Sequence, residues 1–166
     1  MSKEPMQKGG APKWFKLIIL AALIIAAVIV VIALNLNQGG GKFHLSEEYY
    51  GSSEMIAGLT TEQYEDLIAQ KKSFVVMVDK PDCVTTAAMR ENMAHFPDNM
   101  QFSYYQFMWS QMKNSSLHEY VTFVPSVALI REGKVVAWLR ADSDEDTEYF
   151  NSAEALQRWL AEHIEF

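Results

Sequence analysis

The feature that most constrains this 166-residue chain is an uninterrupted apolar run near its start. The run covers residues 17–34, holds 18 residues without a charge, and is extended by Asn35 and Leu36. A helix needs about 20 apolar residues to cross the hydrocarbon core of a membrane, and it satisfies its own backbone polar groups there. Residues 17–36 are therefore predicted to form one transmembrane helix.

A cleaved signal peptide is the alternative interpretation of this run. The apolar part of a signal peptide usually spans about 7–15 residues and ends at a cleavage site of small residues. Here the run has 18 residues and ends in Ala33, Leu34 and Asn35, which is a poor cleavage site. Both observations favour an uncleaved signal-anchor helix.

The charges on either side of the run predict its orientation. Four lysines and a single acid, Glu4, precede it, whereas only Lys42 follows closely. The positively charged side of a membrane helix stays in the cytoplasm. We therefore expect residues 1–16 to form a cytoplasmic basic tail of a single-pass cell-membrane protein. The C-terminal domain is expected to be extracytoplasmic.

The part of the chain after the helix is strongly acidic. Residues 37–166 carry ten Lys and Arg residues against twenty Asp and Glu, a net charge of −10. Such a charge argues against nucleic acid as a partner. The chain has one cysteine, Cys83, so it forms no internal disulfide. A lone thiol in an exported domain is a candidate reactive group.

Local patterns predict the first elements of the exported part. Residues 37–58 begin with a glycine-rich stretch and are predicted to be a linker. Thr60 and Gln63 have the spacing of a capping box, which predicts a helix that runs to about Lys71. The continuous apolar run at residues 74–78 predicts a strand buried on both faces.

The remaining pattern alternates helices and strands. The expected elements are a helix capped by Asp82 and ended by residues 97–99, a strand at 101–107, a weakly helical stretch at 110–120, a hairpin of 127–130 and 134–139, an acidic loop at 142–148 and a final helix capped by Ser152. The β–α–β stretch predicts two parallel strands with a right-handed crossover, and the hairpin adds antiparallel strands. Helices must cover both faces of such a mixed sheet.

Residues 59–166 resemble the thioredoxin-like family in this order of elements. The resemblance rests on Cys83 at the start of the helix after a buried strand, on Val124-Pro125 before a later strand, and on the hairpin. It implies a three-layer α/β/α domain with a mixed sheet and a cis-proline loop. It also implies that Val124, Pro125 and Asp82 border a substrate groove beside a catalytic Cys83.

The sequence departs from the family's pattern at three positions. Thr86 stands where the second cysteine of the family's C-x-x-C pair would be, Met77 replaces a buried acid, and Asp82 replaces a tryptophan. A single thiol can form a mixed disulfide with a substrate but cannot resolve that bond internally. Two functions remain open: thiol–disulfide exchange on exported proteins, with Cys83 as nucleophile assisted by Thr86, or a non-catalytic binding or assembly module.

Other polar residues give weaker signals. A helix N-terminus acidifies the Cys83 thiol, whereas the adjacent Asp82 carboxylate opposes the thiolate. Asp142, Asp144 and Asp146 have part of the spacing of a calcium loop but lack its glycine and its final glutamate, so a solvated acidic loop is expected. The four histidines are scattered, and we expect neither a metal nor another cofactor.

Overall fold

The structure of this protein is a computed structural model that describes residues 41–81 and 83–166. The predicted basic tail and transmembrane helix lie outside the described residues, so both remain predictions. Within the described part of the chain, no helix has the length and apolar character needed to cross a membrane. Gly41–Phe166 forms one compact unit.

A five-stranded mixed sheet forms the centre of this unit, with the strand order β1-β3-β2-β4-β5. Its strands are β1 (Met55–Ile56), β2 (Phe74–Asp79), β3 (Tyr104–Met108), β4 (Ser126–Arg131) and β5 (Lys134–Trp138). All six residues of β2 are buried, as the apolar run predicts. β2 and β3 are parallel, which confirms the predicted parallel pair, whereas β4 pairs antiparallel with both β2 and β5.

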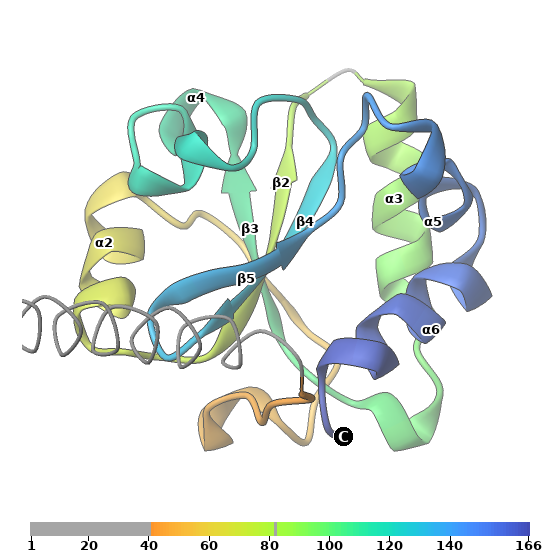
Figure 1. Cartoon of the computed structure of the whole chain (residues 1–166), viewed down its shortest axis with the longest axis horizontal. Coiled ribbons are helices and arrows are strands. Elements are labelled where there is room, and N and C mark those ends of the chain that lie inside the picture. Colours follow the sequence, from red (N-terminus) through yellow and green to blue (C-terminus); the bar gives the residue numbers. More distant parts are fainter. Residues whose placement is uncertain (1–40, 82) are drawn as a thin grey trace, which may run out of the picture. The chain divides into compact units, whose positions relative to one another are not determined.

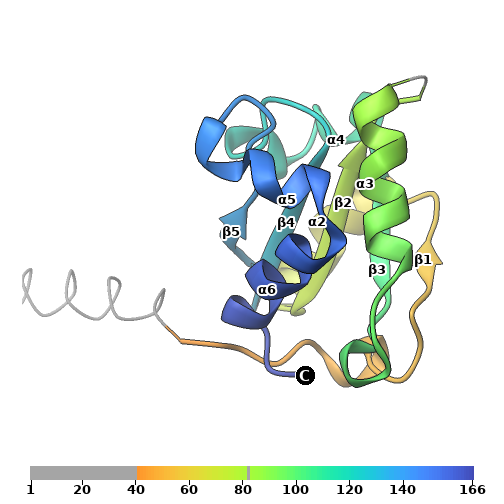
Figure 2. The ribbon, with the colours of Figure 1, turned by 90° about the vertical axis from the view of Figure 1, so that its right-hand side faces the viewer.

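Helices cover both faces of the sheet (Figures 1 and 2). One face carries α2 (Thr61–Ala69) and the short α4 (Trp109–Met112), and the other carries α3 (Val84–Ala94), α5 (Thr147–Asn151) and α6 (Ala153–His163). These three layers and the mixed sheet fit the thioredoxin-like domain that the resemblance implies.

Two of the predicted helix caps, Thr60 and Ser152, are present. The Gln63 backbone N–H donates to Thr60 Oγ1 at 3.2 Å, and Gln63 Oε1 accepts from the Thr60 N–H at 3.0 Å, so the capping box of α2 is complete. Ser152 Oγ likewise accepts from the Ala155 N–H at 3.3 Å and begins α6. These bonds satisfy N–H groups that a helix start otherwise leaves unpaired.

The hairpin between β4 and β5 closes through Glu132 and Gly133, whose φ angles are 50° and 74°. Two consecutive positive φ values are typical of the tight hairpin turn that matches the twist of its strands. A Cβ atom on Gly133 would lie 2.3 Å from the carbonyl oxygen of Ile68, at the end of α2. Glycine is therefore required there both by the backbone angle and by the close approach of α2.

The folded unit is longer than the sequence predicts, because residues 41–58 are part of it and are not a linker. Phe43, Leu45 and Tyr49 are buried in the core. The Phe43 N–H donates to the His163 carbonyl, and the Phe43 carbonyl accepts from the Glu165 N–H, both at 2.9 Å. These contacts join the two ends of the unit, and no periodic sequence pattern signals them.

Three further predictions need adjustment. The predicted strand at 101–107 begins only at Tyr104, because η2 (Asp98–Met100) precedes it as a 3-10 turn. The weakly helical stretch is divided between α4 and η3 (Ser116–Glu119). The predicted acidic loop is partly helical, since η4 (Asp144–Asp146) leads directly into α5.

Aromatic rings fill the core between α2 and the sheet. Tyr64 stacks on Phe107 with ring centroids 5.3 Å apart, and it meets Phe74 edge-on at 6.1 Å. Phe74 in turn contacts Tyr105 edge-on at 5.7 Å. Such pairs add to the stabilisation that ring burial provides. They fix α2 against β2 and β3.

Candidate functional site

Cys83 lies at the start of α3, directly after the loop that follows β2. Its backbone is extended, with φ −100° and ψ 121°, and its carbonyl accepts the first helical hydrogen bond from the Ala87 N–H at 3.2 Å. Cys83 is therefore itself the N-cap residue, a position that the sequence pattern assigned to Asp82. Asp82 lies outside the described residues, so its place in a groove remains a prediction.

The surroundings of the Cys83 sulfur favour its charged form. The thiol is partly exposed and makes no capping hydrogen bond to the helix. The backbone N–H of Thr86, followed by the Thr86 hydroxyl, lowers the pKa of Cys83 below its ordinary value. Slight burial opposes this effect, and the groups of Thr85 add to it. Unpaired N–H groups at a helix start stabilise a thiolate in this way.

Thr86 lies in the first turn of α3, three residues after Cys83. Its side chain is buried, and Oγ1 has no hydrogen-bond partner among the described residues. The hydroxyl nevertheless contributes to the lowered pKa of Cys83. A donor without another partner can bond to a thiolate without giving up an existing bond, so its pairing with the charged sulfur costs little.

The cis-proline loop lies at the same end of the sheet. The Val124-Pro125 peptide bond is cis, as the resemblance implies. Ser126 of β4 pairs with Val78 of β2, and the antiparallel register therefore places Pro125 beside Asp79, the last residue of β2. Val124 is half-buried and Pro125 is buried. The Cys83 loop also leaves the sheet from the end of β2.

A buried ionic network supports this end of the sheet, and the sequence patterns did not predict it. The side chain of Asp79 is 0% exposed, and its Oδ2 accepts hydrogen bonds from Arg90 Nε at 2.8 Å, from a second Arg90 nitrogen and from Gln106 Nε2 at 2.7 Å. Its Oδ1 has no partner among the described residues. The network ties together β2, α3 and β3 around the loop that carries Cys83.

Met77, where the family has a buried acid, is fully buried in β2. The acid of this region is instead Asp79, which lies two residues later in the same strand. In the sequence, the one sign of this buried acid is an aspartate at the end of an entirely apolar run. Neither the arginine eleven residues away nor the glutamine on a neighbouring strand can be assigned as its partner without the fold.

Two apolar side chains near the site are unusually exposed. Val84, the residue after Cys83, is 87% exposed, and Phe123, just before the cis-proline loop, is 53% exposed. Isolated exposed apolar residues are common. Here both flank the two segments that the resemblance assigns to a substrate groove.

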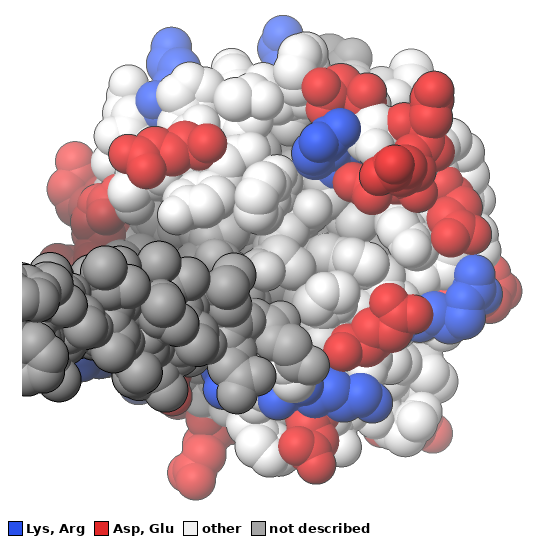
Figure 3. Space-filling model, in the orientation of Figure 1, with Lys and Arg blue, Asp and Glu red and all other residues white. Residues whose placement is uncertain are grey.

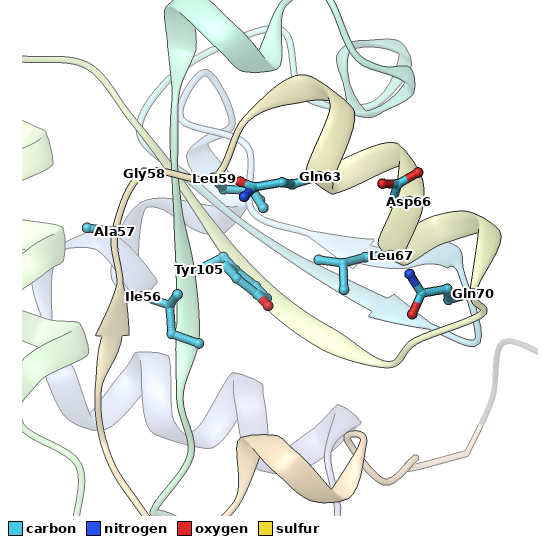
Figure 4. A pocket seen from close by; sticks show the side chains of 9 residues that line it. All are labelled: Ile56, Ala57, Gly58, Leu59, Gln63, Asp66, Leu67, Gln70 and Tyr105. Carbon is cyan, nitrogen blue, oxygen red and sulfur yellow. The ribbon is translucent and has the colours of Figure 1, made fainter.

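A hollow of about 420 Å³ lies elsewhere, between α2 and the edge of the sheet (Figure 4). Leu67, Ile56 and the ring of Tyr105 form its apolar walls. Two of its polar groups are already bonded, since Gln63 Oε1 accepts from Thr60 and the Tyr105 hydroxyl pairs with that of Tyr49. Cys83 is not among the residues that line it.

Comparison with known proteins gives distant structural neighbours only. The sequence matches no protein-family model and no curated protein sequence. Similar solved structures include a protein named Trxlp from Edwardsiella tarda EIB202, at 14% identity and a TM-score of 0.47 over 64% of this chain and 98% of that one. A mutant thioredoxin from Halobacterium salinarum NRC-1 has 15% identity and a TM-score of 0.45 over 70% and 96%. A thioredoxin from Malassezia sympodialis has 12% identity and a TM-score of 0.45 over 73% and 96%.

Proposed function

We propose that this protein is a membrane-tethered, extracytoplasmic thioredoxin-like protein that exchanges thiols and disulfides on exported proteins through Cys83. The observation that carries the proposal is the partly exposed Cys83 thiol at the start of α3, with a lowered pKa. The Thr86 hydroxyl beside it has no other partner among the residues that the structure describes. Thiolate character and exposure are the two properties that make a cysteine reactive.

The exchange reaction needs no oxidant or reductant beyond its substrates. The Cys83 thiolate attacks one sulfur of a substrate disulfide, forms a mixed disulfide with it and releases the other sulfur as a thiolate. The proton lost by Cys83 passes to solvent, and the released thiolate takes one up. Because the chain has no second cysteine, a thiol of the substrate or a small-molecule thiol must then attack the mixed disulfide and free Cys83.

The substrate groove in this proposal is formed by Val124, Pro125 and Asp82. The exposed side chains of Val84 and Phe123 add apolar contact area next to it. An extended, apolar segment of an unfolded exported protein suits such a surface. Thr86 Oγ1 then donates to the attacking or departing Cys83 sulfur.

A non-catalytic binding or assembly module at the membrane surface is the second candidate. The replacement of the resolving cysteine by Thr86 and the exposure of Val84 favour it, because a surface that only holds a partner needs no second thiol. In that case Cys83 serves as a small packing residue, and its reactivity is that of an ordinary thiol.

Exchange is tested with the full-length protein and oxidised glutathione as the probe. We expect rapid formation of a glutathione adduct on Cys83, detected by intact mass, and release of the adduct by added reduced glutathione. Thr86→Val removes the hydroxyl and should slow adduct formation, whereas Thr85→Val, at the exposed neighbouring position, should have a smaller effect. An adduct that forms no faster than on a free cysteine would leave the binding module as the better account.

The proposed topology is tested with the same residue, because Cys83 is the single cysteine of the chain. A membrane-impermeant maleimide should label Cys83 in intact cells. A matched variant with Ser2→Cys and Cys83→Ser should be labelled only after the membrane is permeabilised. Labelling of Ser2→Cys in intact cells would contradict the proposed orientation.

A further inference from the structure

The first described residues of the domain are bonded firmly to one end of the sheet. The Phe43 side chain is 6% exposed, and both backbone polar groups of Phe43 bond to the C-terminal segment, at His163 and Glu165. The Ser46 N–H donates to the carbonyl of Ser73, just before β2, at 2.8 Å. The chain therefore enters the domain at a defined place.

Four short segments meet at this place, and we call the surface that they form the tether end. They are residues 42–48, 70–73, 131–134 and 163–166. The Gly133 N–H donates to the Lys72 carbonyl at 2.9 Å. The Glu132 N–H donates to the Ser73 hydroxyl, also at 2.9 Å. Figures 1 and 2 both show the first of these segments and the C-terminus at the opposite end of the domain from the loop that follows β2.

The tether end differs in charge from the rest of the domain. Its four segments carry five Lys and Arg residues against four Asp and Glu, whereas the rest of residues 37–166 carries five against fifteen more than that one excess acid, sixteen in all. Two of the four acids have a basic partner, since Glu48 pairs with Lys72 at 2.7 Å and Glu165 lies 3.2 Å from His44. On the face drawn in Figure 3, acidic side chains gather over the region of α5, whereas basic and acidic side chains lie side by side toward its lower edge. An anionic surface therefore repels the tether end least.

Several cations of the tether end are accessible to a ligand. The side chains of Lys42, Lys71 and Lys134 are exposed. Lys42 and Arg131 also line a hollow of about 260 Å³, in which Glu132 is the one acidic residue. Ammonium and guanidinium groups are the side chains that pair with phosphate. The tether end thus presents groups that suit the phosphates of lipid head groups.

Along the chain, the tether end directly follows the predicted transmembrane helix. Six residues lead from Leu36 to Lys42, and six residues of fully extended chain reach at most about 20 Å. Lipid head groups extend about 5–7 Å beyond the hydrocarbon core. If residues 17–36 span the membrane, the tether end is always close to the head groups. The loop that carries Cys83 begins at the far end of β2, roughly 17 Å away.

We infer that the tether end rests on the anionic phospholipid head groups of the membrane in which the protein is anchored. This inference rests on the membrane anchor of the proposed function and adds an orientation to it. Lysines near an anionic membrane surface are attracted to it, whereas the strongly acidic remainder of the domain is repelled. The loops of Cys83 and Pro125 lie at the opposite end of the sheet, so they face away from the membrane, toward exported substrates.

The test uses the full-length protein in lipid nanodiscs of equal parts phosphatidylcholine and phosphatidylglycerol, with a nitroxide quencher on some of the head groups. A fluorophore is attached to Cys83 or, in the variant Cys83→Ser with Gln70→Cys, to the exposed position 70 of the tether end. We expect strong quenching at position 70 and little at position 83. Quenching at position 70 should fall in nanodiscs of phosphatidylcholine alone, which carry no net negative charge.

A matched pair of double variants separates the charge of the tether end from the charge of the whole domain. Lys42→Gln with Lys71→Gln removes two exposed cations from the tether end. Lys80→Gln with Lys113→Gln removes two exposed cations near the opposite end, from the loop after β2 and the end of α4. The first change should lower the ratio of contacting to free domains about five-fold per lysine, and the second should not lower it.

The inference is overturned if the two labelled positions are quenched equally, if Cys83 is quenched more strongly, or if both double variants lose contact alike. A protein that inserts into the nanodiscs but shows no quenching at position 70 refutes the orientation and leaves the anchor intact. A protein that does not enter the nanodiscs refutes the anchor itself, and the orientation with it. A failure of glutathione exchange at Cys83 changes none of these outcomes, because quenching needs no reaction with a disulfide.

Discussion

Replacing Arg90 with methionine should destabilise the folded domain far more than the loss of a surface ion pair would. Asp79 is 0% exposed and depends on Arg90 for two of the three hydrogen bonds to its Oδ2. Methionine keeps most of the apolar stem of the side chain but leaves the carboxylate with Gln106 alone. An uncompensated buried charge results.

The expected loss of stability follows from the unequal burial of Asp79 and Arg90. An exposed ion pair contributes about 0–1 kcal/mol, whereas removal of one partner from a buried pair costs about 3–5 kcal/mol. Because the Arg90 side chain is 41% exposed and water screens part of the interaction, we expect the lower end, about 3 kcal/mol. Asp79→Asn should cost only about 1–2 kcal/mol, since the freed guanidinium can turn toward water.

Urea unfolding of a fragment of residues 41–166 measures both values. The account predicts that Arg90→Met costs at least about 1 kcal/mol more than Asp79→Asn. The double variant Asp79→Leu with Arg90→Met should recover part of the loss, because no unpaired charge then remains in the core. Equal losses for the two single variants, or a loss below about 1 kcal/mol for Arg90→Met, would refute the reasoning.

Three further stability predictions use the same fragment. Gly133→Ala should lower the free energy of unfolding by at least about 2 kcal/mol, because it combines a positive φ with a clash against the Ile68 carbonyl. Gly51→Ala has a positive φ but open space around the new Cβ atom, so it should lower the free energy of unfolding by about 1 kcal/mol in the same urea titration. Thr60→Ala breaks the capping box of α2 and should cost about 1 kcal/mol, and an unchanged midpoint would show that the cap is dispensable. A fragment that starts at residue 59 should lack cooperative thermal unfolding, because it loses Phe43 and the contacts of Phe43 with the C-terminal end of the domain. Cooperative melting of that fragment would show that residues 41–58 act only as a linker.

Elements with a strong local signal could be predicted from the sequence. The apolar run of β2, the capping box at Thr60, the Glu132-Gly133 turn and the Ser152 cap each depend on residues within a few positions of one another. Their physical causes are local, so their sequence patterns suffice.

Residues 41–58 could not be predicted because their stabilising contacts are distant. Phe43 is paired with the other end of the chain, and β1 joins the sheet beside β3, which lies far along the sequence. A two-residue strand such as β1 is too short to show an alternating pattern. A mixed segment of this kind looks like a linker until its partners are known.

The candidate site likewise has some features that local sequence patterns predict and others that depend on distant contacts. A cysteine at a helix start and a proline before a strand are visible in the sequence, and both lie at one end of the sheet. The exact cap position was wrong by one residue, since Asp82 and Cys83 are both compatible with a helix start. The partners of Asp79 come from α3 and β3, which are separate segments of the chain, so only the fold brings them together.

The most direct test of the central claim is the rate of alkylation of Cys83 as a function of pH, measured on the folded full-length protein. An ordinary cysteine has a midpoint near a pH of about 8.5. The lowered pKa of Cys83 predicts a midpoint below that value and fast labelling, and Thr86→Val should move the midpoint upward. A midpoint at or above the ordinary value, or labelling only after unfolding, would contradict a reactive thiolate at this site.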